Sequence, residues 1–88
     1  MSTHKSEVEI QAVNLAQQWY SLSAADLPQL SALLPQYLKC FDNEQDKSEF
    51  LEETLRIAKE LVDGPKSQAG KSESYDDFKS VIQQHLSH

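Results

Sequence analysis

The sequence predicts a small all-α protein, a bundle of about four helices in which the second helix is kinked or broken near Pro35. Three observations predict this fold class. Apolar residues recur at spacings of three and four in four separate stretches, which is the periodicity of helices with one buried face. No stretch alternates apolar and polar residues long enough to favour a strand. Turn-forming residues separate the stretches, and the 88 residues suffice for one helical domain over 1–88.

The first predicted helix covers about residues 7–21. Ser6 and Glu9 fit a capping box, in which the serine hydroxyl accepts from a free backbone N–H and the carboxylate reaches back to the cap. Residues 1–5 are therefore expected to form a flexible tail. The central apolar stripe is Val8, Ala12, Leu15, Trp19 and Leu22, and Ile10, Val13, Ala16 and Tyr20 widen it.

The second predicted helix begins after Asp26, a suitable N-cap, with Pro28 in its first turn. Pro35 lies inside the helical pattern, where its ring clashes with the carbonyl of Ser31 and one hydrogen bond is lost. A kink or a break is therefore expected near this proline. The apolar stripe is Leu27, Leu30, Leu34, Tyr37, Leu38 and Phe41.

The third predicted helix has the strongest pattern. Asn43 or Asp46 is expected to cap its start. Gly64, expected in the left-handed conformation, and the following Pro65 mark its end. Its two adjacent apolar stripes are formed by Phe50, Leu51, Leu55, Ile57, Ala58, Leu61 and Val62.

The fourth predicted helix starts near Ser74, with Asp76 and Asp77 in its first turn, where negative charge is favoured. Residues 64–73 before it are expected to form a flexible connection. This helix either packs across its own chain or pairs with a second subunit, so a homodimer is one expected state. Its apolar stripe is Tyr75, Phe78, Val81, Ile82 and Leu86.

Composition narrows the function classes. Eight Lys and Arg against fourteen Asp and Glu give a net charge of −6, which disfavours nucleic acid and anionic membrane surfaces as partners. No apolar stretch approaches the roughly 18 residues of a membrane span, and no apolar run that would indicate a signal peptide follows the N-terminal charges. Cys40 is the one cysteine, so no intramolecular disulfide can form. We therefore expect a cytoplasmic protein.

The stretch GPKSQAGKS, residues 64–72, resembles a phosphate-binding P-loop. That motif needs four residues between its two glycines, followed by Lys and Ser or Thr. Here five residues separate Gly64 from Gly70, and Pro65 lacks an N–H donor. The stretch also follows a helix and not a buried strand. We interpret it as a helix connection and expect no nucleotide cofactor.

Metal and catalytic sites are also weakly indicated. Lys47 at the sixth position of a would-be EF-hand loop replaces the required glycine, so no calcium site is expected, although four carboxylates have the right spacing: Asp42, Glu44, Asp46 and Glu53. His85 and His88 are three residues apart and lack a third ligand nearby. Cys40 has no base near it in sequence and is expected to be a half-buried structural thiol. We expect no catalytic, cofactor-binding or metal-binding residues.

The remaining hypothesis is a non-enzymatic, small acidic helical protein that acts by protein–protein interaction. Trp19 and Tyr20 are adjacent and point about 100° apart, so both could pack at the core, or one could anchor a partner. The alternative is an acidic inhibitor, or immunity-type antagonist, of a basic protein such as a nuclease, because residues 42–63 hold eight carboxylates against three cations. The candidate interaction residues are Trp19, Tyr20, Glu49, Glu52, Glu53 and Glu60.

Overall fold

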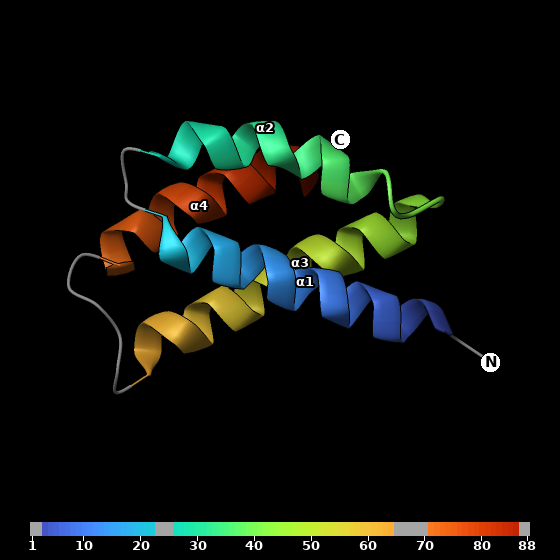
Figure 1. The fold of residues 1–88 in the computed structure, drawn as a ribbon, viewed down its shortest axis with the longest axis horizontal. Helices are drawn as coiled ribbons and strands as arrows, with labels where there is room; N and C mark the ends of the chain where they lie inside the picture. The colour runs from blue at the N-terminus through green and yellow to red at the C-terminus, as the bar shows by residue number, and fades with distance from the viewer. Residues whose placement is uncertain (1–2, 23–25, 65–70, 87–88) are drawn as a thin grey trace.

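The structure, a computed structural model, describes residues 3–22, 26–64 and 71–86. Within these ranges the chain is all helix and turn, with no strand, so the predicted all-α class is confirmed (Figure 1). The helices are α1 (Thr3–Ser21), α2 (Leu27–Leu38), α3 (Glu44–Asp63) and α4 (Lys71–Leu86). In the part of the chain that is described, no helix is both long enough and apolar enough to cross a membrane.

Successive helices alternate in direction, so α1 and α3 run the same way along the long axis and α2 and α4 run back (Figure 1). The closest and most extensive packing joins α1 to α3, followed by α3 to α4, while the backbone of α2 approaches α1 less closely. The molecule measures 40 × 25 × 18 Å. Its short dimension fits about two layers of helices, each about 10–12 Å across.

Trp19 lies at the centre of the core and is 1% exposed. Its ring stacks on Phe78 of α4, with centroids 5.0 Å apart, and makes edge contacts with Tyr20 and Tyr75. α4 therefore packs on its own chain, which is the first of the two placements expected for it. The other fully buried large side chains come from all four helices: Leu15, Leu30, Leu34, Phe50, Leu51, Thr54 and Ile82.

Two predicted helix starts are wrong. α1 begins at Thr3, so Ser6 lies inside the helix and not at its start, and the expected flexible tail 1–5 overlaps the helix from Thr3 onward. α4 begins at Lys71, which places Ser74 inside the helix and 6% exposed. Ser74 is four residues before Phe78, so it continues the buried stripe as a small residue. Ser74 is therefore a buried position within α4 and not its N-cap.

α2 continues through Pro35 to Leu38, so the chain does not break at the proline. Pro35 costs one hydrogen bond, whereas its own carbonyl still accepts from the Lys39 N–H at 3.1 Å. The fully buried Leu30 and Leu34 hold the helix against the core. Phe41 lies beyond the helix end yet is 6% exposed, and its ring lies 5.2 Å from that of Phe50.

Of the two predictions made for the ends of α3, the one for its start is confirmed and the one for its end is wrong. The predicted Asn43 cap is confirmed, because its Oδ1 accepts from the Asp46 N–H at 2.7 Å. The left-handed conformation expected for Gly64 is wrong, because its φ is −68° and its ψ is 158°. The reason is Pro65, since a proline disfavours the helical region for the residue before it. A Cβ at Gly64 would lie 3.3 Å from the carbonyl oxygen of Glu60.

Replacing Asn43 by alanine is expected to lower the free energy of unfolding by about 1 kcal/mol, because an N–H in the first turn of α3 loses its acceptor. Urea denaturation followed by circular dichroism measures the change. Asn43→Ser, which keeps a capping oxygen, is the matched control and should lie within a few tenths of a kcal/mol of wild type. Equal losses in both variants would show that the cap is not what stabilises this end.

Candidate functional site

The acidic residues singled out in the third helix share one face of α3. At 100° per residue, the positions of Glu49, Glu52, Glu53, Glu60 and Asp63 fall within about 100° of arc. Glu49, Glu52 and Glu60 are exposed and Glu53 is half-buried. The sequence hypothesis of an acidic face on this helix therefore has a geometric basis.

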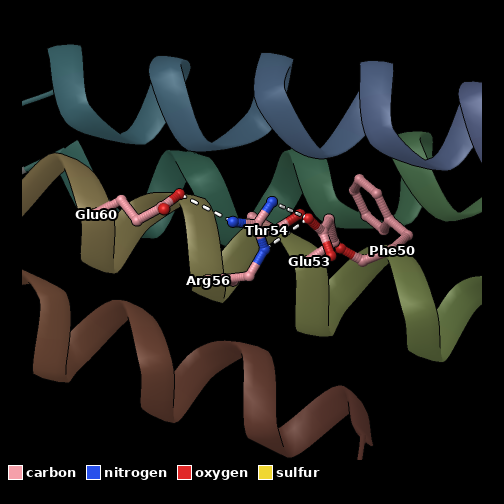
Figure 2. Close-up of polar contacts among 5 residues, drawn as sticks. All are labelled: Phe50, Glu53, Thr54, Arg56 and Glu60. Atoms are coloured by element: carbon pink, nitrogen blue, oxygen red, sulfur yellow. Dashed lines mark hydrogen bonds and ion pairs between the residues drawn. The ribbon is translucent and has the colours of Figure 1, made fainter.

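Arg56 lies within this face and neutralises part of it. Its Nε donates to Glu53 Oε1 at 2.7 Å, and its Nη1 donates to Glu60 Oε2 at 3.0 Å (Figure 2). The hydrogen bond to Glu53, reinforced by the carboxylates of Glu53, Glu60 and Glu9, raises the pKa of Arg56 above its ordinary value. Glu53 and Glu60 are thus engaged within α3, which leaves Glu49 and Glu52 as the more available charges.

A hollow of about 250 Å³ lies between α1 and α3. Its lining is one valine and four glutamates: Val8, Glu9, Glu49, Glu52 and Glu53. Among the described residues, no Lys or Arg lies within ion-pair distance of Glu9, Glu49 or Glu52. Three carboxylates from two helices therefore concentrate negative charge at this opening.

Two large apolar side chains lie exposed on α1. Ile10 is 53% exposed and Val13 is 36% exposed, and no other large apolar side chain that the structure describes is as exposed. They are three residues apart, so they are neighbours on one face of α1. Val13 is also four residues from Glu9 and therefore adjoins the rim of the hollow.

Trp19 and Tyr20 fit the core-packing alternative. Trp19 is buried and cannot serve as a surface anchor, while Tyr20 is half-buried at the margin of the core. Sequence reasoning assigned Ile10 and Val13 to a widened core face and did not single out Glu9. The useful signal was present, because Ile10 lies roughly 180° from Trp19 around a helix and the two cannot share a buried stripe.

Other predicted features are resolved as follows. Residues 44–53, which had four carboxylates at EF-hand spacing just before or within them, are helical. In the described ranges, no group of three metal-ligating side chains is close enough to hold an ion. His85 lines a hollow of about 220 Å³ together with Glu44 and Lys47, whereas His88 lies outside the described residues. So do residues 65–70 of the loop that resembles a P-loop.

Cys40 is exposed, which corrects the expected half-buried thiol. It follows the end of α2, and its thiol donates to the Gln36 carbonyl with sulfur 3.9 Å from oxygen. Nearby, the Tyr37 hydroxyl donates to Gln18 Oε1 at 2.8 Å. Partial burial, and then the neighbouring Cys40, raise the pKa of Tyr37. A hollow of about 350 Å³ between α1 and α2 is lined by Gln11, Gln18, Leu33, Gln36, Tyr37 and Cys40.

Comparison with protein-family models, with curated proteins and with solved structures found no match. Any function for the chain therefore has to be argued from the residues and geometry above.

Proposed function

We propose that the protein is a non-enzymatic interaction module whose protein partner docks on the α1–α3 surface, formed by Ile10 and Val13 with Glu9, Glu49 and Glu52. One observation carries this proposal: Ile10 and Val13 are exposed neighbours on α1, and Val13 adjoins Glu9, which lines an acidic hollow. Single exposed apolar residues are common on monomers. Here two of them are neighbours on one helix face, and a recess with polar walls adjoins Val13, which is the arrangement of an apolar contact with a polar rim.

The second candidate is an acidic antagonist of a basic protein, and a specific observation favours it. Glu9, Glu49 and Glu52 meet at one opening, and none of the three forms an ion pair with a described cation. Binding by such a surface would be steeply salt-sensitive, because salt weakens the attraction between exposed charges over a distance of about 8 Å at physiological ionic strength.

We also propose a cytoplasmic location, since the single cysteine gives the chain no intramolecular disulfide.

The double substitution Ile10→Glu with Val13→Glu is expected to abolish partner capture while leaving the fold intact. Both side chains are exposed, so the free energy of unfolding should change by no more than about 1 kcal/mol for the pair. Buried apolar contacts in an interface each contribute about 1–2 kcal/mol or more when they are central, so affinity should fall at least about tenfold. Affinity capture from cell extract at low and high salt, compared between variants, measures this.

The matched control is Gln29→Glu with Ala32→Glu, which adds the same two charges at exposed positions of α2. Proteins retained by wild type and by this control, and lost with the α1 variant, support the proposal. An identical set of captured proteins for all three would reject the α1–α3 surface as the interface. Salt sensitivity of the retained proteins distinguishes the two candidates, since an apolar contact tolerates high salt and a purely acidic one does not.

A further inference from the structure

We propose that the occupant of the α1–α3 surface is a basic amphipathic helix of a partner protein, with its apolar stripe on Ile10 and Val13 and its flanking Lys or Arg side chains directed to Glu9, Glu49 and Glu52. This inference rests on the proposed function and specifies its partner.

The apolar part of the surface suits a helix. Ile10 and Val13 are three residues apart on α1, a helix of 19 residues, so they form a short stripe along the axis of that helix. An amphipathic partner helix recognises such a stripe through apolar residues at positions i, i+3, i+4 and i+7. α1 is covered by α3 on the face that carries the buried Ala12, Leu15 and Ala16, so its Ile10 side remains open.

The charge part of the surface selects the sign of the partner. Arg56 forms ion pairs with Glu53 and Glu60 and acts on Glu9 only at longer range, whereas Glu9, Glu49 and Glu52 line the hollow beside Val13 without an ion pair to a described cation. The hollow of about 250 Å³ is many times the ~10–15 Å³ that one water molecule needs, so it has room for the end of a long basic side chain. Negative charge is therefore in excess at the hollow, which meets the edge of the apolar stripe where Val13 adjoins Glu9.

The same charges disfavour a second copy of this chain as the occupant. Each chain carries a net charge of −6, and a twofold interface presents the same patch from both subunits. The carboxylates of both copies would then meet at one contact, where like charges repel. A basic partner avoids this repulsion, and the negative charge of the carboxylates also steers it to the surface.

Binding of designed helical peptides tests the assignment by fluorescence anisotropy of the labelled peptide. The probe is an acetylated, amidated leucine–lysine peptide with leucine at positions i, i+3, i+4 and i+7. One comparison peptide carries glutamate in place of lysine, and another has the leucine–lysine composition scrambled so that no stripe forms. The leucine–lysine helix should bind at least about tenfold more tightly than either, and its affinity should fall as salt rises.

Three variants locate the binding. Glu49→Gln with Glu52→Gln should lower the affinity for the leucine–lysine peptide about three- to tenfold, since each exposed ion pair contributes modestly. Ile10→Ala with Val13→Ala should weaken it by at least as much. The matched control, Asp76→Asn with Asp77→Asn, removes two exposed carboxylates from α4 and should leave the affinity within about twofold, because those charges lie away from the surface.

Equal weakening by the α3 and α4 charge variants, or equal binding of the scrambled peptide, would show attraction to net charge alone and would overturn the assignment. Equal binding of the leucine–glutamate peptide would overturn the basic partner while leaving an apolar docking face. A wild-type dimer in sedimentation that is lost with Ile10→Glu and Val13→Glu would make a second copy the occupant. If no peptide binds, the partner assignment fails, and the capture comparison separately decides whether the proposed function stands.

Discussion

Replacing Trp19 by alanine is expected to lower the free energy of unfolding by about 3–5 kcal/mol. The indole is 1% exposed and contacts three aromatic rings, two of which belong to α4. Its removal leaves a cavity where α1 meets α4, so both burial and ring stacking are lost. Proteins of 88 residues have stabilities of roughly 4–13 kcal/mol, so the variant should lose much or all of its folded population at 37 °C.

Urea denaturation at 25 °C, followed by circular dichroism, measures this loss. The matched control is Tyr20→Ala, the adjacent aromatic residue, which is half-buried and should cost about 1 kcal/mol, the ordinary effect of a substitution at a partly buried position. A loss for Trp19→Ala no greater than that for Tyr20→Ala would contradict the central place of Trp19 in the core.

Replacing Pro35 by alanine is expected to stabilise the protein by about 2–2.6 kcal/mol. Proline is about 3 kcal/mol less favourable than alanine inside a helix, and the alanine N–H can donate to the Ser31 carbonyl. Part of this gain, about 0.4–1 kcal/mol, is offset because proline also restricts the unfolded chain. Pro35 is exposed, so no core contact is lost with its ring. Chemical denaturation gives the free energy, and amide exchange at position 35 reports the new hydrogen bond.

Pro28→Ala is the control for this substitution, because it exchanges the same residues in the same helix. Pro28 lies in the first turn of α2, where no intrahelical N–H bond is missing. Its replacement should give no gain and a loss of up to about 1 kcal/mol through the unfolded state. A stabilisation of similar size at both positions would mean that the helix interior is not the cause at Pro35.

The helices were predictable because their apolar periodicity is regular, and α3 was located best because Asn43 and Gly64 both mark its ends. Local signals failed where packing competes with them. Ser74 has the chemistry of a cap, but its position on the buried stripe of α4 extends the helix past it. The conformation of Gly64 followed from the residue after it and not from its own freedom.

The candidate site was only half predictable. Glu49, Glu52, Glu53 and Glu60 are regularly spaced on one helix, so the sequence alone placed them together. Glu9 joins them only because α1 packs across α3, which no spacing within either helix reveals. Ile10 and Val13 were missed since an apolar residue beside a strong stripe is read as core, and only the packed structure shows which side of α1 stays uncovered.

The stack of Trp19 on Phe78 also gives the molecule its own optical probe. Trp19 is the chain's one tryptophan, so the emission of the unmodified protein comes almost wholly from an indole enclosed between α1 and α4. A partner that settles on the outer side of α1 leaves that indole dry and its emission at short wavelength. A partner that displaces α4 admits water and shifts the emission to the red, so a single spectrum separates docking on a closed bundle from opening of it.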